Sequence, residues 1–578
     1  MKIFLNKISY KIILFFIIIL ALFFRLYGLN WDQGQHLHPD ERFLTMVASA
    51  IIIPSSFTDY LNPQISTMSP YNNNYSFFVY GTFPLYLTKV AGVITGNDGY
   101  GNIHFIGRIL SALFDIGTVF LLFKIGQKIL NVKAGLLAAF LYSIMVLPIQ
   151  LSHFFAVDTF LNFFLISSFY FLVLFSSKSF FRPSLFLGIS FGLALACKIS
   201  ALYFLPIVGF GYLYSFINEK NKKFVIASFL LFVICFLSFF RLAQPTAFSS
   251  GNFLNWQPSP QFVANLKELK NMSGSDSWYP PAVQWHSTKP ILFPLKNMVL
   301  WGMGLPLGII AVISLIYSLI SLITPISLKS PKSLKSFVLL LIIVWVLGLF
   351  TYLGLQFCKS IRYFLPIYPF LALLSANLLS KLNIKFMIFI IFIIFIYPLS
   401  FLSIYSRPIT RVTASKWIYE NIPNNAVVTF EEWDDGLPLS LPNYPYNPYK
   451  TESLFMYDFD TPEKWQKLNE KLARVDYIFL TSNRAYGSIL KLPGKYPQSS
   501  FYYQSLFRDT GEFQKVAEFT SRPCFPPFGD RHLFCFNDDN AEEAFTVYDH
   551  PKVIIFKKIP YQNHSPNKEL LPLWDYSK

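Results

Sequence analysis

Residues 12–29 read IILFFIIILALFFRLYGL, an apolar run long enough to cross a lipid bilayer. About 20 helical residues at 1.5 Å each span the hydrocarbon layer. A polar segment, residues 38–42, follows within a few positions and contains the carboxylates Asp40 and Glu41. Ionisable groups at a membrane boundary are costly unless they are solvated or paired, so this segment is a candidate functional site. Because Pro39 precedes the two carboxylates, the segment is equally compatible with the first turn of an ordinary helix.

The composition indicates a polytopic membrane protein. The 578 residues are 53% hydrophobic and 19% aromatic, and only 14% are charged, whereas a soluble protein has about 25% charged residues. The net charge of +16 is by itself compatible with binding to nucleic acid. However, 22 of the 32 acidic residues lie after Ser406, so the positive excess lies in the membrane half. Short basic loops between spans explain that excess, and we expect no nucleic-acid partner.

The hydropathy of the chain predicts about eleven transmembrane helices. The first run has no small-residue cleavage site, so we interpret it as a retained anchor with a cytoplasmic N-terminus. The even-numbered connections then carry two or three basic residues each, which the positive-inside rule requires of cytoplasmic loops. The predicted spans are 12–29, 103–125, 134–150, 157–177, 184–197, 199–217, 224–241, 293–323, 336–356, 362–380 and 386–404.

This topology predicts a membrane domain over residues 1–405 in the plasma or inner membrane. Its external loops are residues 30–102 and 242–292. The first loop contains two apolar pieces, Phe43–Ile53 and Phe77–Val90, that are too short to span. We expect both to form short helices lying in the membrane interface.

Residues 406–578 are predicted to form a soluble α/β domain outside the cell. The segment Thr461–Ala473 has the pattern of a helix. Cys524 and Cys535 lie in an oxidising compartment in this topology, which permits a disulfide. Strands are predicted at Ala426–Phe430, Tyr477–Thr481 and Val553–Phe556.

Ionisable residues of the membrane domain gather at its predicted outer face. Asp40 and Glu41 follow the first span, and Asp158 begins the fourth. Acids and cations at one depth suit a reaction on a lipid-linked phosphate, because cations hold the phosphate and a carboxylate accepts a proton. The cations at this face are Arg108, Lys198, Lys359 and Arg362.

Each of these residues also has a purely structural interpretation. The cations are compatible with side chains that reach toward lipid headgroups. Asp158 is compatible with a helix cap. Asp115 lies seven residues after Arg108 on the same helix face, so the two are as compatible with a structural ion pair as with chemistry.

Two histidines beside the acidic pair raise the alternative of a divalent metal. His36 and His38 lie within five residues of Asp40 and Glu41, and imidazole and carboxylate are both metal ligands. Solvated or hydrogen-bonded loop histidines are the favoured interpretation, so we expect no metal cofactor.

Several segments together resemble the GT-C superfamily of membrane glycosyltransferases. Within this superfamily the chain resembles glycosyltransferase family 39, which contains protein O-mannosyltransferases, the aminoarabinose–lipid A transferase and bacterial relatives. The resemblance extends over about 400 residues with consistent sidedness. The matching segments are Asp40-Glu41, Gly107–Asp115, the surroundings of Asp158, Ala196–Ile199 and Arg362–Pro366.

The resemblance implies an inverting, usually metal-independent transfer of a sugar from a polyprenyl-phosphate carrier to an acceptor hydroxyl. The acceptor is a protein, a glycolipid or a cell-wall glycan. By motif, Asp40 is the general base, Glu41 orients the site or shares that role, and Asp158 helps to position acceptor or base. The residues expected to bind the donor phosphate are Lys198, Arg362, Lys359 and Arg108.

Two other classes of protein are rivals to a transferase. A transporter or lipid flippase is also polytopic, but it places its charges near the bilayer midplane in related halves. We find the charges at one face and no half-repeat. A receptor or assembly protein that works through the external domain needs no acid–base cluster.

Overall fold

The computed structural model describes residues 2–177, 181–323, 333–529 and 531–559, with the side chains of the first helix described from Tyr10 onward. The chain divides into two compact units. Unit 1 comprises Met1–Asp276, Lys289–Ser406 and Pro523–Glu542, and unit 2 comprises Ser277–Thr288, Arg407–Arg522 and Glu543–Lys578.

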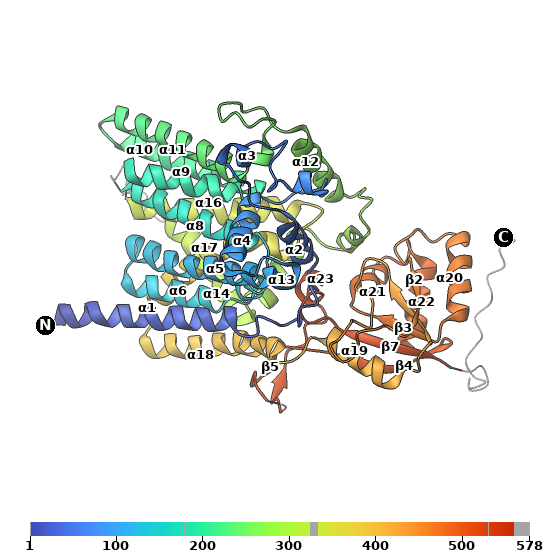
Figure 1. The fold of residues 1–578 in the computed structure, drawn as a ribbon. Coiled ribbons are helices and arrows are strands. Elements are labelled where there is room, and N and C mark those ends of the chain that lie inside the picture. The colour runs from blue at the N-terminus through green and yellow to red at the C-terminus, as the bar shows by residue number, and fades with distance from the viewer. Residues whose placement is uncertain (1, 178–180, 324–332, 530, 560–578) are drawn as a thin grey trace. The chain divides into compact units, whose positions relative to one another are not determined.

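The main helices of unit 1 run roughly side by side as a bundle (Figure 1). They are α1 (Lys2–Leu26), α5 (Tyr100–Ile129), α6 (Val132–Ser143), α7 (Val146–Ser152), α8 (Asp158–Ser176), α9 (Phe181–Leu195), α10 (Leu205–Asn218), α11 (Lys222–Ala243), α14 (Leu305–Ile323), α16 (Leu334–Leu355), α17 (Tyr368–Leu379) and α18 (Ile384–Phe401).

Short helices link these elements, and α2, α3, α4 and α12 lie toward the end of the bundle where α1 ends (Figure 1). The α-helical links are α2 (Pro39–Ala50), α3 (Phe57–Leu61), α4 (Thr82–Thr95), α12 (Pro260–Met272) and α13 (Leu292–Asn297). The 3-10 helices are η1 (Pro70–Asn73), η2 (Ile199–Phe204), η3 (Pro245–Ala247), η6 (Ile361–Ile367) and η7 (Leu402–Ser406). A short π-helix, η5, spans Met298–Gly302.

The surface of the bundle is suited to lipid. Large apolar side chains lie on this surface, and those of Phe15, Ile234 and Phe392 are each at least 60% exposed. Such side chains suit the hydrocarbon of a bilayer, in which helices satisfy their backbone groups internally. Close packing relies on small residues, as is typical in membranes. A Cβ on Gly188 or Gly192 of α9 would lie 2.6 Å from a backbone oxygen of α11. The chain is therefore a multi-pass helical membrane protein.

All eleven predicted spans fall on helices. Among the described residues, eight helices are long and apolar enough to cross a membrane on their own. The number is nine if α6 and α7, which bend by 58° between them, form one span. The eight do not include α1 or α9, which has only 15 residues.

Unit 2 is an α/β fold around a five-stranded sheet with the order β2-β1-β3-β7-β4. The inner strand β1 runs parallel to β2 and β3, whereas β7 is antiparallel to both β3 and β4. The strands are β1 (Val427–Glu431), β2 (Lys450–Leu454), β3 (Tyr477–Leu480), β4 (Phe513–Phe519) and β7 (Val553–Lys558). The helices are η4 (Pro280–Trp285), α19 (Thr410–Asn421), α20 (Pro462–Arg474), α21 (Arg484–Ile489), α22 (Pro497–Phe507) and α23 (Glu543–Thr546).

Alternating side chains of the sheet enter two different cores. Ile478 and Leu480 of β3 pack with residues of α20, α21 and α22 on one face. Tyr477 and Phe479 pack with residues of α19 on the other. This alternation is the ordinary consequence of the period of two in a strand, and it explains why β3 has no exposed face.

The predicted boundary at residue 406 differs from the observed division. Pro523–Glu542 belongs to unit 1, where the backbone N–H of Cys524 donates to Ser403 Oγ at 2.8 Å. The permitted disulfide is formed, between Cys524 and Cys535 of the hairpin β5 (Cys524–Phe525) and β6 (Phe534–Cys535). Conversely, Ser277–Thr288 belongs to unit 2, because Val283 lies in its core.

Candidate active site

The first turn of α2 separates its two carboxylates. His38 is the N-cap, and its Nδ1 accepts from the backbone N–H of Glu41 at 3.2 Å. Pro39 occupies the first helical position, which suits its fixed φ angle. Since consecutive helical residues point about 100° apart, Asp40 and Glu41 have different neighbours. The helix-start interpretation and the site interpretation are thus both compatible with the structure.

Glu41 points into a closed network with Arg108 and Asp32. It accepts from Arg108 Nε at 2.9 Å, from Arg108 Nη2, and from the Phe155 backbone N–H at 2.7 Å. Arg108 Nη2 also lies 2.9 Å from Asp32 Oδ2, and none of these three side chains is exposed. This network ties α2 to α5.

Asp40 points the other way, toward Arg362 of η6. The two side chains form an ion pair in which both remain partly exposed. Tyr80 also hydrogen-bonds to Asp40. Burial alone would raise the pKa of Asp40, but the charges of Arg362 and His38 and the two hydrogen bonds outweigh it. The pKa of Asp40 therefore lies well below its usual range, and the carboxylate is ionised at neutral pH.

Asp158 and Lys198 complete the cluster. Lys198 Nζ lies 2.8 Å from Asp158 Oδ1, and Arg362 Nε lies 3.8 Å from Asp158 Oδ2. The ring of Tyr363 lies beneath Lys198, with its centroid 5.0 Å from Nζ. We call Asp40, Arg362, Asp158 and Lys198 the charged quartet.

A close backbone approach joins the segment that follows Tyr80 to the segment that precedes Lys198. The N–H of Gly81 donates to the Cys197 carbonyl at 2.9 Å, and the N–H of Phe83 donates to the Ala196 carbonyl at 3.1 Å. A Cβ on Gly81 would lie 1.9 Å from the Ala196 oxygen, so only glycine fits. These bonds fix Tyr80 beside the segment that carries Lys198.

Glu542 holds the start of η6, the element that carries Arg362. Glu542 accepts from the Ser360 hydroxyl and from the Ile361 backbone N–H at 2.7 Å. Its own backbone N–H donates to Asn297 Oδ1 at 2.8 Å. The start of η6, and with it Arg362, is thus held by a residue 180 positions later in the chain.

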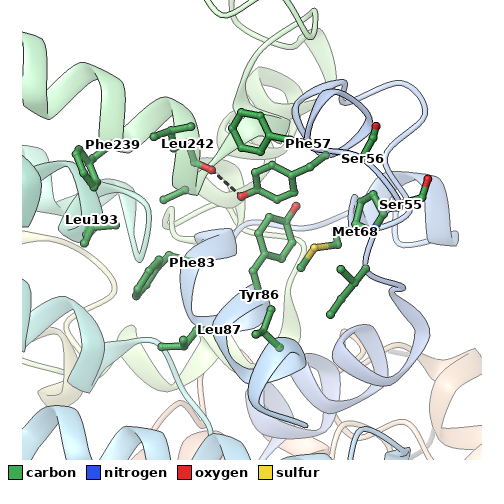
Figure 2. A pocket seen from close by; sticks show the side chains of 15 residues that line it. Ser55, Ser56, Phe57, Met68, Phe83, Tyr86, Leu87, Leu193, Phe239 and Leu242 are labelled. Carbon is green, nitrogen blue, oxygen red and sulfur yellow. Dashed lines mark hydrogen bonds between the residues drawn. The ribbon is translucent and has the colours of Figure 1, made fainter. Parts of the chain in front are cut away.

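A cavity of about 600 Å³ is lined by residues of α4, α9 and α11 and by residues of the loop after α2 (Figure 2). Its lining is almost wholly apolar, with the rings of Phe57, Phe83, Tyr86 and Phe239 around it (Figure 2). Phe83 lies three residues after Tyr80, so segment 80–83 lines the cavity through Phe83 and contacts Asp40 through Tyr80. The further lining residues are Ile53, Pro54, Ser55, Ser56, Tyr60, Met68, Leu87, Val90, Leu193, Leu242 and Ala243.

Comparison with known proteins found one matching family model and several solved structures of similar fold. A family model described as dolichyl-phosphate-mannose-protein mannosyltransferase matches residues 85–240. The archaeal oligosaccharyltransferase AglB from Archaeoglobus fulgidus, solved with an inhibitory peptide and a dolichol-phosphate, is similar in structure. The TM-score is 0.52 at 14% identity, over 86% of this chain and 72% of that chain. The chain has the GT-C fold.

Two further structures were found to be similar. The Archaeoglobus fulgidus oligosaccharyltransferase tethered to an acceptor peptide matches with a TM-score of 0.51 at 12% identity, over 96% of this chain and 89% of that chain. ArnT from Cupriavidus metallidurans gives 0.45 at 12% identity, over 72% and 66%. No curated protein sequence matches the chain.

Two of the predicted phosphate ligands have other contacts in this GT-C structure. Arg108 is fully buried, and its Nη1 donates to the Leu29 carbonyl at 2.6 Å in addition to its contacts with Glu41 and Asp32. We therefore withdraw Arg108 from the phosphate site. Lys359 is buried and donates to the Phe357 carbonyl at 2.8 Å. Burial lowers the pKa of Lys359.

The suggested pairing of Arg108 with Asp115 does not occur. Asp115 instead pairs with Arg25 of α1 at 2.7 Å and accepts from the Tyr142 hydroxyl. Seven residues of helix separate the first two Cα atoms by about 10 Å along the axis, and each finds a nearer partner on another helix.

The histidines have structural contacts. His38 caps α2, and its ring packs on Phe154 with centroids 4.4 Å apart. The ring of His36 packs against His104 and Tyr100, each with centroids 4.5 Å apart. Among the described residues, no three His, Cys, Asp or Glu side chains are grouped so as to hold a metal ion.

Sequence reasoning missed Tyr80 and Glu542. Tyr80 lies within Phe77–Val90, for which the sequence predicts only a short helix in the membrane interface, and nothing in the sequence singles out its hydroxyl. Glu542 lies in a segment that we assigned to the soluble domain. Tyr363, by contrast, stands inside the motif Arg362–Pro366 on which the family resemblance rests.

Proposed function

We propose that this protein is an inverting glycosyltransferase that moves a sugar from a polyprenyl-phosphate carrier to an acceptor hydroxyl. The observation that carries the proposal is the charged quartet, in which Asp40 pairs with Arg362 and Asp158 pairs with Lys198, and in which Asp40, Arg362 and Lys198 are partly exposed. The GT-C fold supports glycosyl transfer in general. The hydroxyl acceptor, the inversion and the outer face of the membrane belong to the proposal.

The quartet supplies what such a transfer requires. Asp40 accepts the proton of the acceptor hydroxyl as that oxygen attacks the sugar. The leaving phosphate is already an anion, so it needs cations more than an acid. Lys198 and Arg362 are the cations we assign to it. Asp158 orients both of them, since it lies within 4.0 Å of each.

The apolar cavity supports a lipid-linked substrate. We assign it to part of the hydrocarbon chain of the carrier, because an apolar cavity of about 600 Å³ is of the size and character that bind an apolar ligand. The archaeal oligosaccharyltransferase with the similar fold was solved with a dolichol-phosphate, which supports this assignment.

The location of the quartet favours a transferase over a transporter. Asp158 is the first residue of α8, and Lys198 follows the end of α9. The charges thus gather at one end of the bundle rather than in mid-helix, where a transporter places its site.

The test is glycosyl transfer by the full chain in lipid nanodiscs. Polyprenyl-phosphate sugars serve as donors, and extracted envelope proteins, glycolipids and glycans serve as acceptors. Asp40→Asn should lower transfer by about 1,000-fold or more, because the site then lacks its proton acceptor. Asp276→Asn, at an exposed position, is the matched control and should behave as wild type. Full transfer by a folded Asp40→Asn protein would exclude Asp40 as the base.

A further inference from the structure

The quartet presents a conflict that the proposed function has to resolve. Arg362 is assigned to the donor phosphate, yet in the structure it is paired with the base Asp40. The remaining members are also matched, since Lys198 pairs with Asp158 at 2.8 Å. Two carboxylates and two cations therefore neutralise one another within the quartet.

Pairing with Arg362 makes Asp40 a poor base. The guanidinium and the Tyr80 hydroxyl hold the pKa of Asp40 well below its usual range, and a base with so low a pKa accepts a proton weakly. The same ion pair also covers Oδ2, the oxygen that contacts Arg362 Nη2. In this arrangement Asp40 is ionised but is not ready to accept a proton.

We propose that Arg362 exchanges its partner Asp40 for the donor phosphate when the donor binds, and we call this exchange the hand-over. The base is thus released only when a donor is bound. Tyr80 keeps the released carboxylate in place. This hand-over rests on the proposed function, and it makes Tyr80 a positioning residue. It also orders the reaction, because an acceptor that binds first meets a base still occupied by Arg362.

The geometry allows this exchange with little movement. Arg362 has two sides in use, since Nη2 contacts Asp40 and Nε lies 3.8 Å from Asp158. Asp158 can keep the Nε side while the Nη2 side changes partner. A planar guanidinium with donors on separate edges suits such a role, because it binds carboxylate and phosphate in the same way.

Tyr80 is placed to hold Asp40 after the exchange. Burial and the charge of Asp40 raise the pKa of Tyr80 well above its usual value, so the hydroxyl stays protonated and remains a donor. Its position is set by the backbone bonds of Gly81 and Phe83 to the residues before Lys198. The carboxylate thus keeps one hydrogen bond when it loses the ion pair.

The charges balance during the transfer itself. The acceptor oxygen forms a bond to the anomeric carbon, and the bond from that carbon to the phosphate oxygen breaks with its electron pair on the phosphate. The acceptor proton moves to Asp40, which becomes neutral. The phosphate gains the negative charge that Asp40 loses, so Arg362 on the phosphate lies where the new charge appears.

A structure of the full chain in nanodiscs with polyprenyl monophosphate tests the hand-over directly. We expect Arg362 to contact the phosphate, and the distance from Nη2 to Asp40 to exceed the ion-pair limit of about 4 Å. Tyr80 should still contact Asp40. An intact pair of Asp40 and Arg362 beside a bound phosphate would overturn the hand-over and leave the proposed function standing. Failure of the lipid phosphate to bind at all would overturn both.

The pH dependence of the rate gives a second test. The acid limb of kcat/KM for the donor reports the free protein, and that of kcat reports the donor complex. The midpoint of the acid limb of kcat should lie in the ordinary carboxylate range, near pH 4 to 5. The midpoint of the acid limb of kcat/KM should lie at least about 1 pH unit lower. Coincident limbs would contradict release of the base by the donor.

Tyr80→Phe tests the positioning residue. Loss of one hydrogen bond to the carboxylate should lower kcat about tenfold, leave the donor KM within about twofold and move the acid limb of kcat to higher pH. Tyr75→Phe is the matched control, since Tyr75 lies in the same loop and packs edge-on against Phe43. A Tyr80→Phe protein with the kcat and pH profile of wild type would remove Tyr80 from the proposal.

Discussion

At the scale of single residues, Asp40 and Glu41 show how adjacent identical charges acquire different roles. Glu41 is fully buried with Arg108 and Asp32, whereas Asp40 is partly exposed beside Arg362. The sequence predicts that both matter, because both follow a membrane span. It does not distinguish them, because the distinction depends on which segments pack against each side of α2.

The two carboxylates should therefore differ in their effect on stability. Glu41→Gln leaves Arg108 buried with one of its two carboxylates, and it should lower the free energy of unfolding by about 3 kcal/mol. Asp40→Asn removes a partly solvated pair and should cost about 1 kcal/mol or less. Thermal unfolding of both variants in detergent checks this. Equal losses would mean that Glu41 has no special structural role.

At the scale of elements, the turn before α4 is the contact on which the site most depends. The N–H of Gly81 bonds to the Cys197 carbonyl, and a Cβ there would meet the Ala196 oxygen at 1.9 Å. The sequence contains Gly81 but does not reveal why a glycine is needed there, because Ala196, which lies against it, is 115 residues later in the chain.

Gly81→Ala should separate α4 from the end of α9. We expect a loss of stability of about 1 to 3 kcal/mol from overpacking, together with a lower kcat because Tyr80 and Lys198 move apart. Gly101→Ala, where nothing lies within 4 Å of the added Cβ, is the control and should retain both properties. Thermal unfolding and the transfer assay measure the two effects. Wild-type activity in Gly81→Ala would show that the close approach is dispensable.

Strand β1 of unit 2 ends in a buried acid with consequences for pH stability. Burial raises the pKa of Glu431 to about 8 from 4.5, with the hydrogen bond from Tyr503 opposing the shift. Between these values the folded unit keeps a proton that the unfolded chain has lost, so its stability should fall as pH rises from about 4.5 to 8.

Glu431→Gln provides the comparison for that prediction, since an amide cannot ionise. The variant should lose the fall in stability over this range, while the wild type keeps it. Hydrogen exchange of the β1 and β3 amides in the full chain, corrected for intrinsic rates, measures the local stability. Parallel pH curves for the two proteins would show that Glu431 does not titrate in this range.

At the scale of the whole molecule, we propose that the transfer needs no resident metal. Lys198 and Arg362 lie within one cluster and supply the positive charge that a divalent cation would offer a leaving phosphate. Protein treated with a chelator should keep its full transfer rate. Loss of activity that Mg²⁺ or Mn²⁺ restores would contradict this and reopen the role of His36 and His38.

Local patterns were enough to locate most elements of the fold. Long apolar runs predicted eleven helical segments, and alternation predicted β1, β3 and β7 to within two residues. The strands β2 and β4 were missed, because Lys450–Leu454 and Phe513–Phe519 are polar edge strands without a clear apolar pattern. The separation of Pro523–Glu542 from unit 2 was missed too, because it depends on contacts such as that of Cys524 with Ser403.

Local sequence properties alone identify a polytopic membrane protein with acids and cations at the ends of its spans. Hydropathy and charge are local properties, and a bilayer acts on them directly. Which of these charges meet depends on how the helices pack in the folded protein. In the folded protein Arg362 pairs with Asp40, which is 322 residues earlier, and Asp115 pairs with Arg25. Arg108 is buried against Asp32. Such pairings follow from helix packing, and no single segment encodes the packing of its neighbours.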